Sequence, residues 1–151
     1  MLEELPAMVD VVIEYPRGAM IKRRPDGSVD FIAPLPCPYN YGSIPGFIAG
    51  DGDALDAVVL GPRLALGARV RVRVFGVIDF IDDGCEDPKV ICGEAVPGRL
   101  QCAGLLAFFS SYALFKRALS RVRGSTRVTR SGGWLRRPGR ACGQARGDSR
   151  R

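Results

Sequence analysis

Residues 69–78 read Arg-Val-Arg-Val-Arg-Val-Phe-Gly-Val-Ile, the clearest alternation of charged and apolar side chains in the chain. A period of two places the valines on one face of a strand and the arginines on the other. Gly76 interrupts the run and favours a bulge or bend, the feature that curls a sheet toward a barrel. The stretch therefore predicts a long strand with one buried face in a curved sheet.

Shorter apolar runs around this stretch supply the other predicted strands. They cover residues 9–14, 21–24, 29–32, 57–60 and 89–92, with an edge strand at 127–129. Pro25-Asp26-Gly27-Ser28 has the composition of a tight turn, so the runs on either side of it form a hairpin. Residues 33–50 are rich in Pro, Gly, Tyr and Asn, which predicts an ordered irregular loop.

One stretch carries a helical pattern, from about Leu100 to Val122. Its large apolar side chains recur at offsets of three or four: Leu105, Phe108, Phe109, Tyr112, Phe115 and Leu119. We take Phe108, Phe109 and Phe115 as core residues, and we expect Trp134 to pack on the same domain. The combined pattern predicts an α+β fold in which one long C-terminal helix packs against a small sheet or barrel.

Length and charge indicate one domain followed by a tail. The chain has 151 residues, 46% of them hydrophobic, enough for one core. Residues 1–115 hold 10 Lys and Arg against 15 Asp and Glu (10 − 15 = −5), whereas residues 116–151 hold 12 against 1 (12 − 1 = +11). We expect a domain over 1–134 and a basic, disordered tail over 135–151, either solvated or in contact with nucleic acid.

Several classes of protein are excluded by composition. The chain contains no histidine, which removes Ser-His-Asp triads, Cys-His dyads and His-ligated zinc. Its 5 cysteines form no Cys-x-x-Cys pair, so neither a disulfide framework nor a zinc knuckle is expected. Glu3 and Glu4 replace the basic start of a signal peptide, and no apolar run approaches membrane-spanning length. We expect a cytoplasmic protein without a membrane partner.

Two acidic clusters carry the main indication of chemistry. Residues 51–56 read Asp-Gly-Asp-Ala-Leu-Asp, and residues 82–89 read Asp-Asp-Gly-Cys-Glu-Asp-Pro-Lys. Carboxylates this close repel one another unless a cation lies among them, and hard divalent ions such as Mg²⁺ prefer such oxygen ligands. An isolated triple of this kind is as often an ordinary acidic surface turn. Two clusters and a lysine together favour metal-assisted phosphate chemistry.

The order of the motifs resembles the soluble family I inorganic pyrophosphatases over roughly residues 9–134. The matching pieces are residues 11–16, Lys22, residues 37–42 with Ile44-Pro45, residues 51–56, Gly76-Val77, residues 82–89, 108–112 and 133–134. The resemblance implies a small, highly curved OB-like β-barrel with flanking helices. Similarity to bacterial members also implies a homo-oligomer such as a hexamer.

The resemblance also implies a role for each matching residue. Asp51, Asp56, Asp82 and Asp87 correspond to Mg²⁺ ligands, with Glu14 acting through metal-bound water. Asp53 corresponds to the general base, with Tyr41 and Lys89 as further catalytic groups. Substrate contacts correspond to Lys22, Tyr41, Lys89 and Tyr112. The implied activity is magnesium-dependent hydrolysis of inorganic pyrophosphate to two phosphates by metal-activated water; the alternative is a weak or inactive member that binds pyrophosphate or another phosphorylated metabolite.

The chain departs from the family pattern on the predicted hairpin. Arg24 stands where the family usually has a glutamate, two residues beyond Lys22. The arginine that normally follows a Val-Asp pair has no counterpart, because Phe31 comes directly after Asp30. Either Arg23 or Arg24 is a candidate to supply the lost phosphate contact.

A second departure lies on the predicted helix. Ala113 replaces the lysine expected after Tyr112, which leaves Lys116, four residues from Tyr112 on roughly the same helix face, as the substitute. Ala54 also replaces the usual proline of the first acidic motif. Because the metal-facing carboxylates are complete while the phosphate-facing set is altered, we expect weaker substrate binding.

Overall fold

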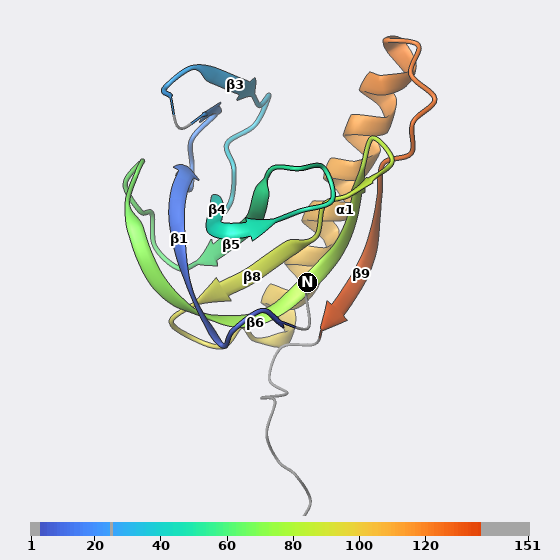
Figure 1. Ribbon diagram of the computed structural model, residues 1–151. Coiled ribbons are helices and arrows are strands. Elements are labelled where there is room, and N and C mark those ends of the chain that lie inside the picture. The colour runs from blue at the N-terminus through green and yellow to red at the C-terminus, as the bar shows by residue number, and fades with distance from the viewer. Residues whose placement is uncertain (1–3, 25, 137–151) are drawn as a thin grey trace, which may run out of the picture.

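The computed structural model describes residues 4–24 and 26–136. In chain order the elements are β1 (Met8–Tyr15), β2 (Ile21–Arg23), β3 (Val29–Ile32), β4 (Asn40–Ile48), β5 (Ala54–Leu60), β6 (Arg69–Asp82), β7 (Cys85–Glu86), β8 (Lys89–Gly93), α1 (Arg99–Val122) and β9 (Arg130–Arg136). Figure 1 shows the long curved β6 running beneath the other strands, with α1 along one side of the sheet.

The strand predicted from the Arg-Val alternation organises the sheet. β6 pairs with β1, β7, β8 and β9 along different parts of its length. The three arginines of its first half are exposed while Val72 is buried, as the period of two predicts. Its register with β8 shifts between Val74 and Gly76, which confirms the bulge expected at this glycine.

The strands close into a barrel. The order β1-β4-β5-β8-β6 returns on itself because β6 also pairs with β1, and only β5 and β8 run parallel within this path. The interior is filled by small and branched apolar side chains, among them Val11, Ile13, Ile44, Leu55 and Val77. Closure removes the free edges that an open sheet of this size would expose.

α1 covers the outside of the barrel. Leu105, Phe109 and Ala113 form its buried stripe and pack on a second cluster that includes Ile78 and Phe80. Phe115 was expected in the core, but its side chain is 42% exposed because it lies off this stripe. By length and composition alone α1 is also long and apolar enough to cross a membrane, which the sequence analysis did not expect. Its contacts with the sheet identify it as the cover of the barrel.

The expectation of an irregular loop over residues 33–50 is wrong, because β4 occupies Asn40–Ile48. Asn40, Gly42 and Ile44 are buried in alternation, so the segment has strand periodicity. Gly42 is a packing residue and no strand breaker: a Cβ there would lie 2.1 Å from the Val12 backbone oxygen. Only glycine lets β4 approach β1 this closely.

The predicted edge strand at residues 127–129 is also wrong, since β9 begins at Arg130. Trp134 packs against the cluster beneath α1, as expected. β9 runs on to Arg136, two residues into the segment predicted as a tail, and residues 137–151 lie outside the described part of the chain.

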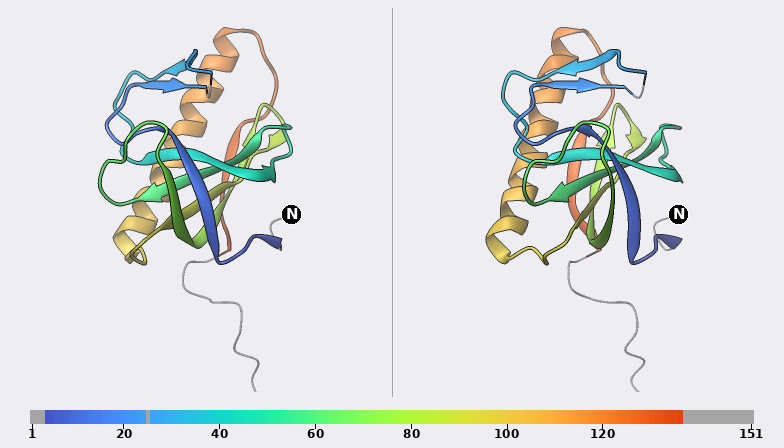
Figure 2. Two further views of the ribbon diagram at one scale, coloured as in Figure 1. Left: turned by 60° about the vertical axis from the view of Figure 1, so that its left-hand side comes forward. Right: turned by 90° about the vertical axis from the view of Figure 1, so that its left-hand side faces the viewer.

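The predicted hairpin forms a separate two-stranded sheet of β2 and β3. Figures 1 and 2 show it standing beyond the barrel, at the same end as the C-terminal half of α1. A groove of about 620 Å³ separates the two, with Val29, Phe31 and Ile32 on the hairpin side and Phe115 and Leu119 on the helix side. The hairpin is therefore attached to the barrel through its stem.

Candidate active site

The two acidic clusters, distant in sequence, meet in space. The backbone N–H of Gly50, beside the first cluster, donates to the backbone oxygen of Glu86 in the second at 3.1 Å. A Cβ at Gly50 would lie 2.9 Å from that oxygen, so the close approach needs glycine. A shared metal site requires the two acidic clusters to lie side by side, and this contact brings them together.

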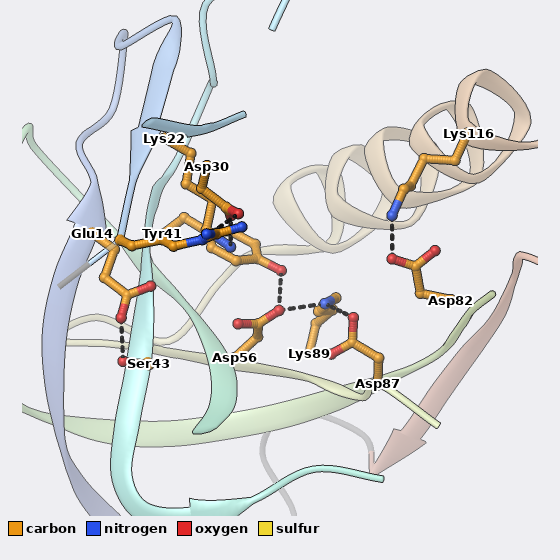
Figure 3. A network of polar contacts seen from close by, with 11 residues as sticks. Glu14, Lys22, Asp30, Tyr41, Ser43, Asp56, Asp82, Asp87, Lys89 and Lys116 are labelled. Carbon is orange, nitrogen blue, oxygen red and sulfur yellow. Dashed lines mark hydrogen bonds and ion pairs between the residues drawn. The ribbon is translucent and has the colours of Figure 1, made fainter. Parts of the chain in front are cut away.

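Lys89 lies at the centre of the meeting point. Its Nζ is 2.5 Å from Asp56 Oδ2 and 2.5 Å from Asp87 Oδ2, and the lysine is only 3% exposed (Figure 3). Burial lowers the pKa of Lys89, but attraction to Asp56 and Asp87 outweighs it and leaves the pKa above the ordinary value. A charged lysine is thus held between two carboxylates supplied by different strands and turns.

The two carboxylates that share Lys89 have pKa values shifted in opposite directions. Burial raises the pKa of Asp87 to about 6, because the attraction of Lys89 is offset by repulsion from Asp56 and Asp51. Burial acts on Asp56 too, but Lys89 and Lys22 together bring its pKa below the ordinary value. At Asp87, burial and the neighbouring acids outweigh the attraction of Lys89, whereas at Asp56 the attraction of two lysines outweighs burial.

Tyr41 links this centre to the hairpin. Its hydroxyl donates to Asp56 Oδ2 at 2.9 Å, and its ring centroid lies 5.7 Å from Lys89 Nζ and 5.6 Å from Lys22 Nζ. Burial and then the charges of Asp56 and Asp87 raise the pKa of Tyr41 well above its ordinary value. The hydroxyl therefore remains a hydrogen-bond donor throughout the neutral range.

Asp82 is held by the helix and by the segment before β9. Lys116 Nζ pairs with Asp82 Oδ2, and the Thr129 hydroxyl donates to Asp82 Oδ1 at 3.3 Å. Lys116 also lies 5.7 Å from the Tyr112 ring centroid, which confirms that the two share a helix face. Thr129 is buried and was missed by sequence reasoning, because a lone threonine among arginines gives no signal of its own.

Tyr112 borders the same group of acids from α1. Its ring stacks on Phe80 with centroids 5.8 Å apart. Burial, followed by the charges of Asp82, Asp56 and Asp87, raises the pKa of the Tyr112 hydroxyl. The Tyr112 hydroxyl therefore keeps its proton in the neutral range, under the influence of all three carboxylates.

The remaining predicted residues lie at the margin of this centre. Glu14, at the end of β1, accepts a hydrogen bond from the Ser43 hydroxyl at 2.6 Å. Asp51 and Asp53 are exposed in the β4–β5 turn, where Asp51 Oδ1 accepts from the Asp53 backbone N–H at 3.0 Å. Asp53 is thus tied to Asp51 through its own backbone N–H.

The carboxylate oxygens of this group are the type of ligand that a hard cation prefers. Within residues 4–24 and 26–136, no three carboxylates or thiols lie close enough together to form a ready metal cage. The reason is visible in Figure 3, where Lys89 stands between Asp56 and Asp87 and Lys116 contacts Asp82. The oxygen-only donor set fits a divalent ion such as Mg²⁺.

The cationic side chains of the hairpin, where the chain departs from the family pattern, lie outside this group of acids. Arg24 Nε contacts Asp30 Oδ1 at 3.2 Å and its side chain is 62% exposed, so it does not fill the space between the acids. Lys22 Nζ contacts the other oxygen of Asp30 at 3.5 Å. Ala113, by contrast, is buried against the barrel and does not face the acids at all.

Comparison with known proteins agrees with this arrangement. The protein-family model described as "Pyrophosphatase: Inorganic pyrophosphatase" matches residues 11–101. The chain belongs to the inorganic pyrophosphatase family. The matched region holds every site residue named above from β1 to β8, and it ends before Tyr112 and Lys116 on α1.

Individual relatives show the extent of the similarity. The chain is 38% identical over 98 residues to the inorganic pyrophosphatase of Gluconobacter oxydans, covering 60% of this chain and 57% of the relative. It is 40% identical over 104 residues to inorganic pyrophosphatase 1 of Pseudomonas syringae pv. tomato, covering 63% and 58%. The chain thus spans little more than half the length of these curated relatives.

Solved structures extend the similarity to the fold. The inorganic pyrophosphatase of Thermus thermophilus superposes with a TM-score of 0.67 at 32% identity, covering 89% of this chain and 85% of that one. That of Coxiella burnetii superposes with a TM-score of 0.68 at 26% identity, covering 87% and 90%. These likenesses confirm the predicted OB-like barrel.

Proposed function

We propose that this chain hydrolyses inorganic pyrophosphate to two phosphates in a magnesium-dependent reaction. The observation that carries the proposal is the buried Asp56–Lys89–Asp87 group, with Tyr41 bonded to it, inside the region that matches the family. Pyrophosphate is a small polyanion, and its hydrolysis needs many positive charges and donors in one place. The lysines and protonated tyrosines of the candidate site supply such charges and donors, and its carboxylates can hold cations.

We assign the metal-binding role to Asp51, Asp56, Asp82 and Asp87, with Glu14 in a more distant position. When bound, divalent cations neutralise phosphate oxygens and lower the pKa of a water molecule. Support for this assignment is the close grouping of Asp56 and Asp87 around Lys89, inside the region that matches the family. Asp53, exposed in its turn, is the proposed base that takes the proton of the attacking water.

The cationic and hydroxyl groups of the chain would hold the substrate. Lys89 has three N–H donors and is held by two carboxylates, so a phosphate oxygen can compete for it. Tyr41 and Tyr112 keep their protons because burial and nearby acids raise their pKa values, and each offers a fixed donor. Lys22 approaches the same region from the hairpin side of the Tyr41 ring.

Cellular context is part of the proposal. We propose a cytoplasmic protein, since the four described cysteines Cys37, Cys85, Cys92 and Cys102 are all free thiols, which suits a reducing compartment. We propose a homo-oligomer such as a hexamer, since Leu100 and Val122 on α1 are 90% and 86% exposed and need a cover. Contact of residues 138–151 with nucleic acid concerns a segment outside the described residues.

The test is phosphate release from pyrophosphate by the purified chain, with and without Mg²⁺. Release should require Mg²⁺ and should fall by about 10²-fold or more in Asp56→Asn, because this residue touches Tyr41 and Lys89 as well as the proposed ion. Asp10→Asn is the matched control, since Asp10 is exposed and pairs with the exposed Arg71. Calorimetric binding of pyrophosphate without any release at saturating Mg²⁺ would establish the inactive binder instead.

A further inference from the structure

The β2–β3 hairpin places two cations on a single carboxylate. Lys22 Nζ lies 3.5 Å from Asp30 Oδ2, and Arg24 Nε lies 3.2 Å from Asp30 Oδ1. One negative charge against two positive charges leaves the cluster with a net charge of +1. A second anion arriving there would meet two side chains that Asp30 does not fully neutralise.

This cluster adjoins the candidate active site. Lys22 Nζ lies 5.6 Å from the Tyr41 ring centroid, and the Tyr41 hydroxyl donates to Asp56. Figure 3 shows Lys22 and Asp30 beside the Tyr41 ring, on the side away from Lys89. A ligand held by Tyr41 and Lys22 is therefore separated from Arg24 only by the Asp30 carboxylate, which contacts both cations.

The neighbouring Arg23 makes a different contact. Arg23 Nη1 donates to the Gly27 backbone oxygen at 3.0 Å, a contact within the hairpin turn. The two candidates left open by the sequence are thus separated by their contacts: Arg23 stabilises the turn, while Arg24 shares a carboxylate with Lys22. Arg24 also retains freedom to move, because its side chain is 62% exposed.

We infer that Arg24 is a substrate-binding residue whose resting partner is Asp30, and that a phosphate oxygen replaces the Asp30 carboxylate at Arg24 and Lys22. Arg24 then raises affinity for the substrate, and Asp30 lowers it by competing for the same donors. The guanidinium suits the exchange, because it offers paired N–H donors to a carboxylate or a phosphate equally well. The inference rests on the proposed function only for the chemical class of the ligand, a pyrophosphate.

The test is calorimetric titration with imidodiphosphate, an analogue in which nitrogen replaces the bridging oxygen, in the presence of Mg²⁺. Arg24→Gln should weaken binding by about 10-fold, the loss of one charge-assisted contact. Arg23→Gln is the matched control and should change the Kd by less than about twofold. Asp30→Asn should tighten binding by about threefold or more, because the competing anion is removed.

Two outcomes overturn the inference. Equal weakening by Arg23→Gln and Arg24→Gln would mean that only the overall charge of the hairpin matters. Weaker binding in Asp30→Asn would mean that Asp30 positions the cations and does not compete with the ligand. Arg24→Lys provides a further check, since it keeps the charge but loses the paired geometry and should recover only part of the affinity.

Kinetics separate this inference from the proposed function. In an active enzyme, Arg24→Gln should raise KM while leaving kcat within about twofold, the pattern of a contact made equally in ground and transition states. Absence of phosphate release with the expected order of Kd values would reject the hydrolase and keep the Arg24 site. Normal release with equal Kd values for Arg23→Gln and Arg24→Gln would reject only the Arg24 site.

Discussion

The acids of the candidate site and the cations proposed to face phosphate are held by different kinds of structure. Asp56 and Asp87 lie on or beside barrel strands whose register is fixed by pairing on both sides, and Lys89 is buried between them. Lys22, Arg24 and Lys116 project from a hairpin and a helix that flank the barrel, and each is at least a quarter exposed.

This difference explains where the chain departs from its family. A carboxylate in the barrel cannot move by one residue without turning to the other face of its strand. A long cationic side chain on a flanking element can reach the same region from a neighbouring position. The barrel acids that the resemblance identifies are accordingly present, while Arg24 replaces a glutamate on the hairpin and Lys116 is the proposed substitute for a helix lysine.

The largest effect is expected at Lys89, the one buried cation among the residues that the structure describes. Lys89→Met leaves Asp56 and Asp87 facing each other without a counter-charge, and it should destabilise the protein by about 3 kcal/mol and abolish phosphate release. Urea unfolding at pH 7 measures the first effect. Lys116→Met is the control on the flanking helix, and its ion pair with Asp82 is about a quarter exposed. Equal destabilisation by the two variants would mean that the buried ion pairs of the barrel and the partly exposed ion pair of the helix contribute equally to stability.

A pair of glycines tests the same contrast at the backbone. Gly42→Ala forces a Cβ to within 2.1 Å of the Val12 oxygen in the barrel, and we expect a loss of about 3 kcal/mol because neither strand can give way. Gly27→Ala in the hairpin meets no atom within 4 Å and pays only for its φ of +83°, about 1 kcal/mol. Thermal unfolding of both variants checks the order, and a greater loss in Gly27→Ala would contradict it.

A third prediction concerns the helix position at which the family carries its lysine. Ala113 is 4% exposed and packs in the cluster with Ile78 and Phe80, so Ala113→Lys should cost about 2 kcal/mol. Ala118→Lys, on the exposed side of α1, should change stability by less than about 0.5 kcal/mol. If Ala113→Lys is neutral and tightens substrate binding, the helix can turn that position toward the acids and Lys116 is no substitute.

The sequence predicts the barrel better than it predicts the contacts between elements. The Arg-Val alternation identifies β6, and the spacing of Leu105 and Phe109 identifies α1, because these patterns record burial within one element. β4 was missed because Gly42 and Pro45 resemble strand breakers, and the reason for the glycine, the Val12 backbone, lies on another strand.

The residues of the candidate site also fall into those that the sequence predicts and those that only the fold reveals. Acidic density within residues 51–56 and 82–89 predicts the carboxylates, since each cluster is local in sequence. The sharing of Asp30 by Lys22 and Arg24, and the support of Asp82 by Thr129, depend on how separate segments pack. No spacing in one chain encodes such pairings, so they emerge only from the fold.

The pH dependence of stability compares a thiol in the barrel with one in a turn. Burial raises the pKa of Cys92 from 9.0 to about 12, so the folded state holds this proton where the unfolded state releases it. The contribution is complete below about pH 9 and is lost as pH rises toward 12, at up to about 1.4 kcal/mol per pH unit. Between pH 9 and 11, Cys92→Ala should reduce the fall of the unfolding free energy with pH by the Cys92 contribution and leave the part that comes from Tyr41 and Tyr112, whose pKa values are also raised. Cys85→Ala removes an exposed thiol and should keep the wild-type slope, whereas equal slopes in all three proteins would show that Cys92 loses its proton inside the folded barrel.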